Sequence, residues 1–324
     1  MKKYVLLYGD KKPEDNLCIT NMFENTKPIK LGWTEFDYND NMKIIEESIK
    51  EGIEQIIIYG FEIGWDKMIK DTKEKYPDIN IKVICNTQDS LLYYEYEREN
   101  FFKLLEISKQ NIIEDMAFLR KSQYETYKKL GYKCTYLKEN YIMKESYKKE
   151  DVEEKECDTQ LGIYPLNYTW DKNIFNQLCI AKFINNCNLN YNNLDSRMEE
   201  FLNTMEIKNT PSKIEKIEEE EIIKQLIKND VIVSTSFTEY MHPIFFMSME
   251  LGIPCLIGNN SDLFEEDDEL KKYIVTSAED NAIINSKMVE NILQNKEIIK
   301  DLYKKWKTQY NTQAKTSIKD FIEK

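Results

Sequence analysis

Short runs of β-branched residues alternate with amphipathic helical stretches along almost the whole chain, and this alternation constrains the fold more than any other feature. Such alternation is typical of a parallel sheet covered by helices, so the sequence predicts an α/β protein. In the first half we expect strands at residues 4–8, 55–59, 81–85, 111–114 and 133–137. Helices are expected near residues 40–51, 64–76, 90–107 and 118–130.

The pattern lapses in a charged stretch, residues 138–156, which has no apolar period, and then resumes. Because 324 residues is about twice the length of a typical domain, we place a domain boundary there. The prediction is two Rossmann-like α/β/α domains, residues 1–150 and 151–324, facing each other across a cleft. In the second domain strands are expected at residues 160–164, 188–194, 213–218, 231–236, 255–258 and 273–275. Its helices are expected at residues 172–186, 196–207, 219–229, 241–251 and through 279–323.

Composition and charge exclude several classes of protein. A hydrophobic fraction of 41% and an aromatic fraction of 12% are those of a globular chain. The formal net charge of −13, with no concentration of basic residues, repels nucleic acid and anionic lipid heads. No apolar run approaches the ~18 residues needed to span a bilayer. We therefore expect a soluble, cytoplasmic protein with no nucleic-acid partner and no transmembrane segment.

The seven cysteines are scattered, with no Cys-x-x-Cys pair, and the chain has a single histidine, His242. No cluster with metal-ligand spacing can be drawn from these residues, so we expect no metal site. Scattered cysteines of odd number also argue against a disulfide framework. Buried, reduced thiols are the expected state.

Polar residues follow a predicted strand in the second half, in the order Ser236, Thr238, Glu239 and His242. Open α/β sheets bind ligands at the carboxyl ends of their strands, and Pro243 fits the first turn of the next helix. Hydroxyls and backbone amides that converge on a helix start make an anion site. Glu239 would accept hydrogen bonds from sugar hydroxyls, and His242 titrates near neutral pH. Alternatively, Ser236 or Thr238 simply caps the helix and His242 lies on the surface.

A second loop contains Thr169, Lys172 and Asn173 and enters the helix predicted from residue 172. A lysine at a helix start is unfavourable, because the helix dipole favours anions there. Either a phosphate of a bound partner or the neighbouring Asp171 would account for this cation.

A third loop, Asn259, Asn260, Ser261 and Asp262, follows the strand predicted at residues 255–258. These short polar residues can donate to a phosphate or a hydroxyl, although a plain tight turn uses the same residue types.

Residues 234–260 resemble the C-terminal signature of GT-B glycosyltransferases related to the retaining family 4 (group 1) enzymes. In that signature a loop containing Ser and Glu precedes a helix that ends in Gly-x-Pro, and two glutamates lie eight positions apart. Counted back from Gly252, the first of these positions is Glu239 and the second is Met247.

The resemblance implies that Glu239 contacts the transferred sugar and that Lys172 binds the donor diphosphate. It also implies that the last segment, residues 296–324, returns to the first domain. Met247 departs from the signature, because the glutamate at that position binds the ribose hydroxyls and a thioether cannot accept two hydrogen bonds. Glu250, about 4.5 Å further along the helix axis, is the candidate substitute.

The implied function is that of a hexosyltransferase-like glycosyltransferase that needs no cofactor. With residues 151–324 as the nucleotide-sugar side and residues 1–150 as the acceptor side, it would move a sugar from a nucleoside-diphosphate sugar to an unknown glycan, lipid or protein. The implied mechanism is retaining and metal-independent. We expect Glu239 and His242 to be catalytic. The expected donor-binding residues are Lys172, Asn173, Thr169, Ser236, Thr238, Asn259, Asn260, Ser261 and Glu250.

Three alternatives stay open. The chain could be a noncatalytic GT-B-like subunit or binding protein, which Met247 favours, or a sugar-nucleotide epimerase of the same fold. An inverting mechanism would have to recruit a carboxylate such as Glu62 or Asp89 as the base, because the first half contains no histidine.

Overall fold

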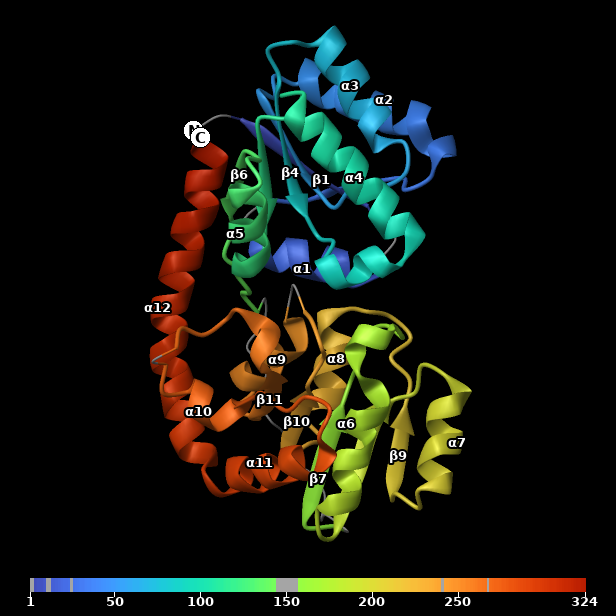
Figure 1. Cartoon of the computed structure of the whole chain (residues 1–324), viewed down its shortest axis with the longest axis vertical. Helices are drawn as coiled ribbons and strands as arrows, with labels where there is room; N and C mark the ends of the chain where they lie inside the picture. The colour runs from blue at the N-terminus through green and yellow to red at the C-terminus, as the bar shows by residue number, and fades with distance from the viewer. Residues whose placement is uncertain (1–2, 10–12, 24–25, 144–156, 240–241, 267) are drawn as a thin grey trace. The chain divides into compact units, whose positions relative to one another are not determined.

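The computed structural model describes residues 3–324 except residues 10–12, 24–25, 144–156, 240–241 and 267 (Figure 1). The chain divides into two compact units. Unit 1 consists of Met1–Ile142 and Asn311–Lys324, and unit 2 consists of Met143–Tyr310. Each unit is built on a six-stranded sheet. The described strand pairs are all parallel, which confirms the prediction of an α/β fold with two Rossmann-like halves.

The sheet of unit 1 has the strand order β2-β1-β3-β4-β5-β6. Its strands are β1 (Tyr4–Gly9), β2 (Ile29–Leu31), β3 (Gln55–Tyr59), β4 (Asn80–Cys85), β5 (Asp115–Phe118) and β6 (Cys134–Tyr136). The helices between them are α1 (Pro13–Met22), α2 (Tyr38–Lys50), α3 (Trp65–Lys75), α4 (Glu95–Lys109) and α5 (Lys121–Lys129).

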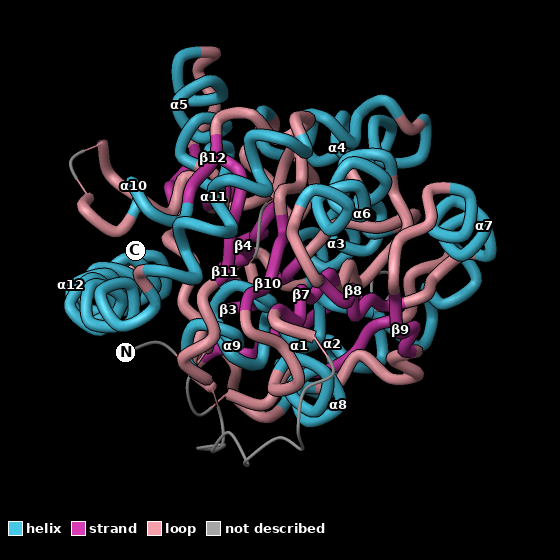
Figure 2. Tube along the Cα trace, turned by 90° about the horizontal axis from the view of Figure 1, so that it is seen from below, coloured by secondary structure: helices cyan, strands magenta, loops and turns pink. Residues whose placement is uncertain are grey.

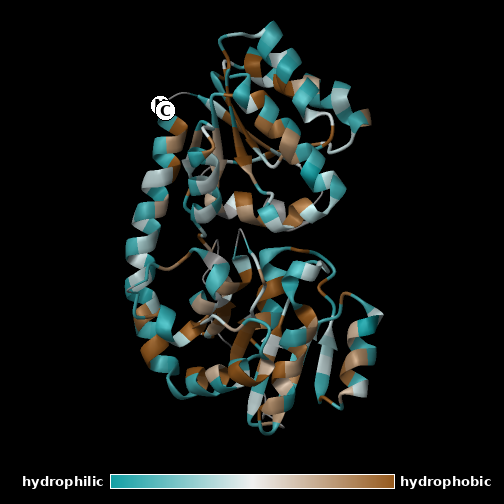
Figure 3. Ribbon diagram, viewed as in Figure 1, coloured by the Kyte–Doolittle hydropathy of each residue, from teal (hydrophilic) through white to brown (hydrophobic). Residues whose placement is uncertain are grey.

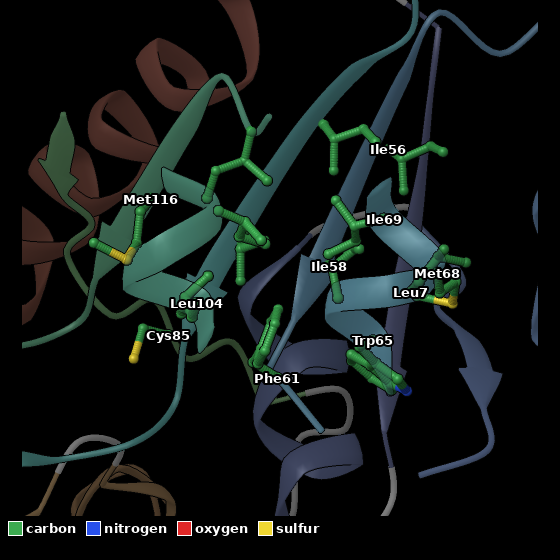
Figure 4. Packing of buried hydrophobic residues seen from close by; sticks show 14 of the residues in the cluster. Leu7, Ile56, Ile58, Phe61, Trp65, Met68, Ile69, Cys85, Leu104 and Met116 are labelled. Atoms are coloured by element: carbon green, nitrogen blue, oxygen red, sulfur yellow. The ribbon is translucent and has the colours of Figure 1, made fainter. Parts of the chain in front are cut away.

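The main core of unit 1 lies between the sheet and helices α2, α3 and α4. Alternate strand residues face this core, as Ile56 and Ile58 of β3 do opposite Trp65 and Ile69 of α3 (Figure 4). Each of these four side chains is at most 1% exposed. Burying one large apolar side chain stabilises the fold by about 1.5–3 kcal/mol. The indole N–H of Trp65 donates to the carbonyl oxygen of Gly32 at 3.0 Å, so the buried ring keeps a polar partner.

The sheet of unit 2 has the strand order β12-β11-β10-β7-β8-β9. Its strands are β7 (Thr159–Ile163), β8 (Cys187–Asn192), β9 (Asn209–Ser212), β10 (Val231–Ser234), β11 (Cys255–Gly258) and β12 (Val275–Thr276). The helices are α6 (Ile174–Ile180), α7 (Ser196–Thr204), α8 (Glu219–Leu226), α9 (Pro243–Glu250), α10 (Lys271–Ile274) and α11 (Ala282–Gln294). Figure 2 shows α8 and α9 on one side of these strands and α6 and α11 on the other.

One face of β8 carries a buried network of side-chain amides. Asn188 donates to Gln160 at 2.9 Å, and Asn190 donates to Asn229 at 2.9 Å. Asn188 also contacts Thr210 of the edge strand at 3.2 Å. Because buried polar groups are costly unless they are paired, this network favours a single register for β7, β8 and β9.

The last helix, α12 (Lys296–Glu323), contributes its first part to unit 2 and its end, from Asn311, to unit 1. Hydrophilic and hydrophobic residues alternate along it (Figure 3). In unit 2, Trp306 stacks on Phe246 of α9 with a centroid distance of 6.3 Å. In unit 1, the fully buried Lys82 of β4 donates to the carbonyl of Phe321. Among the described residues, no helix is both long enough and apolar enough to cross a bilayer.

The strand predicted at residues 111–114 of unit 1 is wrong. Asn111 has a left-handed backbone (φ 57°) in the turn that ends α4, and the strand begins at Asp115. A carboxylate at the start of a buried strand is tolerated here because the hydroxyl of Thr135 donates to Asp115 at 2.6 Å. Helix α1 and strand β2 were not predicted, because residues 10–31 show little apolar periodicity.

Two predictions in unit 2 are also wrong. The strand expected at residues 213–218 lies earlier, at β9, an edge strand that contains Pro211 and has no apolar alternation. Most of the strand expected at residues 273–275 belongs to helix α10, and β12 begins only at Val275.

Candidate functional site

Strands β7 and β10 are neighbours at the point where the chain reverses its direction across the sheet of unit 2 (Figure 1). From β7 the chain proceeds to β8 on one side, and from β10 it proceeds to β11 on the other. Ligands of open α/β sheets bind outside the carboxyl ends of the strands at such a point. The loops at residues 164–173 and 235–242 follow these two strands. Both contain residues that the sequence predicted to bind a ligand.

Lys172 and Glu239 meet at this point. The ammonium nitrogen of Lys172 lies 2.6 Å from Oε2 of Glu239, and the two side chains are 12% and 16% exposed. Lys172 ends a short 3₁₀ turn (Trp170–Lys172) just before α6, so it does not begin the helix as expected. Of the two expected partners, Asp171 is not the one that holds Lys172, since the carboxylate of Glu239 does so.

Backbone and amide contacts join the two loops. The N–H of Phe237 donates to the carbonyl of Asp171 at 2.7 Å. The side-chain amide of Asn173 donates to the carbonyls of Thr235, at 3.0 Å, and Glu279, at 2.7 Å. Asn173 was expected to bind the donor, and the structure shows its amide nitrogen holding three loops together.

The loop after β11 contacts the same region. The amide nitrogen of Asn260 donates to the carbonyl of Ser236 at 2.7 Å. The backbone N–H of Asn259 donates to Oε1 of Glu279 at 2.9 Å. Glu279, in the loop after β12, was missed from the sequence, because no motif marks that loop. The side chain of Ser261 lies outside the described residues.

Thr169 lies in the loop after β7 and is partly exposed. Its hydroxyl donates to Oδ1 of Asn167 at 2.8 Å, a contact within the same loop. The structure therefore places Thr169 in the predicted loop, where its hydroxyl is used locally.

Helix α9 begins at Pro243, two residues after the predicted start, so Pro243 lies in the first turn as expected, and His242 is the N-cap residue. The side chain of His242 makes no capping hydrogen bond, and the alternative of capping by Ser236 or Thr238 stays a prediction. Ser236 and Thr238 are 4% and 7% exposed, and His242 is 7% exposed. A surface position for His242 is therefore wrong.

Met247 and Glu250 of α9 do not contribute to the region around Lys172. The side chain of Met247 is fully buried. Glu250, at the last position of the helix, accepts a hydrogen bond from the hydroxyl of Tyr303 at 2.7 Å and pairs with Lys307, both on α12. Glu250 thus contacts α12 in this structure, at the opposite end of α9 from His242.

The two alternative bases of unit 1 are engaged with neighbouring side chains. Glu62 is 4% exposed and accepts a hydrogen bond from the hydroxyl of Tyr96. Burial, and then the Glu62 carboxylate, raise the pKa of Tyr96. Asp89 accepts hydrogen bonds from Gln123 at 3.1 Å and from Tyr127 at 3.2 Å. Within the described ranges, no group of three or more His, Cys, Asp or Glu residues could hold a metal ion.

Comparison with solved structures identifies the fold. HepE from Anabaena in complex with UDP-glucose superposes with a TM-score of 0.67 at 8% identity, covering 99% of this chain and 100% of HepE. The lipopolysaccharide outer core galactosyltransferase WaaB gives a TM-score of 0.62 at 10% identity, covering 98% and 99%. The N-terminal domain of Candida albicans trehalose-6-phosphate phosphatase gives 0.61 at 10% identity, covering 99% and 89%.

The chain therefore has the GT-B fold of nucleotide-sugar glycosyltransferases, as the sequence predicted. No protein-family model matches the sequence, and no curated protein matches it either. At identities of 10% or less the likeness shows the fold alone. Kinship with the retaining family 4 enzymes stays a prediction.

Proposed function

We propose that this chain is a glycosyltransferase that takes a sugar from a nucleoside-diphosphate sugar and transfers it to an acceptor hydroxyl. The observation that supports this proposal is the Lys172–Glu239 pair, which lies where the sheet of unit 2 changes direction. An ammonium and a carboxylate side by side suit the two parts of such a donor, a diphosphate and a polyhydroxylated ring.

The proposed mechanism begins with competition for Lys172. A bound diphosphate carries more negative charge than one carboxylate, so it takes over the ammonium and releases Glu239. The released carboxylate then accepts hydrogen bonds from hydroxyls of the donor sugar. As the bond between the sugar and the phosphate breaks, Lys172 stabilises the charge that develops on the departing diphosphate.

The finer features of the mechanism are also proposals. Retention of configuration follows from the resemblance to family 4, and metal independence follows from the use of Lys172 as the cation. We propose that His242, at the start of α9, hydrogen-bonds to the sugar or the phosphate. The cytoplasmic location and the lack of nucleic-acid partners rest on the composition and the net charge of −13.

One observation favours a second candidate function, a noncatalytic protein that keeps the fold. Met247 occupies the position of the ribose-binding glutamate and is fully buried, so it offers no polar atom to a ribose. The same fold also occurs in the N-terminal domain of a phosphatase, so the fold by itself does not establish transfer activity.

Product analysis separates these functions. The protein is incubated with UDP-, GDP- and CDP-sugars in the presence of EDTA, beginning with UDP-glucose, the ligand named for HepE. A transferase releases the nucleoside diphosphate slowly by hydrolysis and faster with acceptor. An epimerase changes the sugar and releases no diphosphate. A noncatalytic protein does neither, and that result with every donor would refute the proposal.

A further inference from the structure

A lysine nitrogen and a cysteine sulfur are in contact at the edge of the unit 2 sheet where its strands begin. The Nζ of Lys208 donates to Sγ of Cys157 at 2.8 Å. Cys157 precedes β7 and Lys208 precedes β9, and β8 lies between these two strands. Because the three strands are parallel, the pair lies at the opposite edge of the sheet from the loops that carry Lys172 and Glu239. The proposed transfer reaction does not use it.

The backbone holds the nitrogen and the sulfur near each other. The carbonyl of Lys208 accepts a hydrogen bond from the N–H of Leu189, in β8, at 3.0 Å. Cys187, the first residue of β8, is in register with Thr159, which comes two residues after Cys157. Cys157 is 4% exposed, whereas Lys208 is exposed. The contact therefore lies just below the surface, and a bond between the two atoms needs little movement of the chain.

The partner of this sulfur differs from the partners of three other cysteines. Cys85, Cys134 and Cys255 lie 3.5 Å, 3.9 Å and 3.9 Å from backbone carbonyl oxygens, to which a protonated thiol donates. The sulfur of Cys157 instead accepts from a side-chain nitrogen. Peroxide oxidises a cysteine to a sulfenic acid, and a neighbouring nitrogen can condense with that product. The contact thus joins the two groups that an oxidative cross-link requires.

We propose that Cys157 and Lys208 form a peroxide-dependent modification site, in which the oxidised sulfur is captured in a covalent sulfur–nitrogen bridge. This inference is independent of the proposed function. The Cys157 thiolate attacks one oxygen of hydrogen peroxide, the O–O bond breaks, and the products are a sulfenic acid and hydroxide, which takes up a proton to give water. The neutral amine of Lys208 then attacks the sulfur, the S–O bond breaks, and hydroxide leaves with an amine proton as water.

The bridge is reversible by thiols. The sulfur has lost two electrons to the peroxide, and two molecules of a thiol reductant return them. The first attacks the sulfur, releases the amine of Lys208 and leaves a mixed disulfide on Cys157. The second breaks that disulfide and restores the thiol. The site can therefore respond to peroxide in a cytosol that thiols keep reduced.

Cys187 is the competing nucleophile, because its thiol could form a disulfide with the oxidised Cys157. Burial, and then the neighbouring Cys157, raise the pKa of Cys187 to about 12. Cys187 therefore remains a thiol at neutral pH, and a thiol attacks sulfur far more slowly than a thiolate does. Lys208 already contacts the sulfur, so the structure favours capture by the amine.

The test oxidises the wild type, Cys157→Ser and Lys208→Arg with a small excess of hydrogen peroxide. Peptide mapping without reductant should find the peptides of Cys157 and Lys208 joined in the wild type, with the loss of two hydrogen atoms, and separate after dithiothreitol. Arginine keeps the cation but is a poor nucleophile, so Lys208→Arg should form a sulfenic acid that dimedone traps, and no bridge. Lys182→Arg is the matched control, because Lys182 is also exposed and donates to a carbonyl, that of Glu206.

Melting curves provide a second readout. The bridge joins residues that are 51 positions apart, and such a cross-link lowers the entropy of the unfolded chain. Oxidation should raise the Tm of the wild type and of Lys182→Arg by at least about 4 °C and leave that of Lys208→Arg unchanged. A disulfide between Cys157 and Cys187, an unmodified Cys157, or a bridge that also forms in Lys208→Arg would overturn the proposal.

Discussion

The ammonium of Lys172 lies 2.6 Å from the carboxylate of Glu239, which is 67 residues later in the chain. The sequence implied separate roles for these two residues: Lys172 would bind the donor diphosphate, and Glu239 would contact the sugar. In this structure they neutralise each other. The pair therefore contributes to the stability of the two loops, and in the proposed mechanism it is the first contact that a donor replaces.

Single substitutions in this pair should lower both activity and stability. Lys172→Met and Glu239→Gln each leave the other side chain without its partner, so each should cost about 1–3 kcal/mol of unfolding free energy, between the costs for exposed and fully buried pairs. Each should also reduce transfer or donor hydrolysis by at least about tenfold. Denaturant unfolding and initial rates measure the two effects.

The double variant, Lys172→Met with Glu239→Gln, is the control. Removing both charges leaves neither member of the pair as an unpaired charge, so it should recover most of the lost stability and none of the lost activity. Full activity in either single variant would contradict the site assignment. If the double variant recovered activity together with stability, relative to the single variants, the pair would have only a structural role.

A glutamate at position 247, as in the signature that residues 234–260 resemble, should destabilise this protein. Met247 is fully buried between α9 and its neighbours, and a carboxylate there would lose its hydration without a partner. We expect Met247→Glu to cost more than about 3 kcal/mol, whereas Met247→Leu costs less than about 1.5 kcal/mol. Donor affinity should not increase in Met247→Glu. A stable variant with tighter nucleotide binding would show that this position lines the donor site after all.

The hydrophobic pattern was sufficient for most of the fold, because strands buried on both faces leave an apolar run that few other structures produce. The strand Gln55–Tyr59 and the strand Cys255–Gly258 have the predicted bounds. The pattern failed at Asp115 and at β9, where tertiary contacts support a buried carboxylate and a polar edge strand. Contacts of that kind have no local sequence signal.

For the candidate site, the sequence predicted which loops form it. It did not predict which side chains within those loops contact one another. The motif pointed to Glu239 and Lys172 separately, and their mutual contact depends on the order of the strands. Glu250 has the right chemistry for a ribose, yet Tyr303 and Lys307 engage it, and they belong to a helix that begins 46 residues after Glu250. Glu279 could not be found, because a glutamate in a loop is not distinctive.

Lys82 should anchor the end of α12 to the sheet of unit 1. Its buried ammonium donates to the carbonyl of Phe321 and lies 3.4 Å from that of Ile322, where the helix dipole is negative. Lys82→Met keeps an unbranched side chain, one atom shorter, and removes the donor. Hydrogen exchange of the last turn of α12 should then become at least about tenfold faster, whereas the exposed Lys319→Met should change it little. Equal exchange in both variants would mean that Lys82 is not the anchor.

Buried thiols should be unreactive in the native protein. Burial raises the pKa of Cys187 and of Cys255 to about 12, so almost no thiolate is present at pH 8. Labelling of these two with a disulfide reagent should be at least about a hundredfold slower than in the unfolded chain. The partly exposed Cys134 and Cys179 should be labelled first. Peptide mapping that finds Cys255 labelled as fast as Cys179 would contradict this prediction.

The same shifts set a pH dependence of stability. Because the folded pKa of these thiols lies above the unfolded value of about 8.5, their contribution is complete below that pH. Above it the unfolded chain ionises and the folded chain does not, so the free energy of unfolding should fall as the pH rises towards about 12.

The central claim is that Lys172 and Glu239 form the binding site for the diphosphate and the sugar of a nucleotide-sugar donor. The most direct measurement is calorimetric titration, in EDTA, of the wild type and the double variant with a panel of UDP-, GDP- and CDP-sugars. We predict that at least one donor binds the wild type with a micromolar Kd and binds the double variant at least about tenfold more weakly. Equal affinity of both proteins, or no binding of any donor to the wild type, would contradict the account.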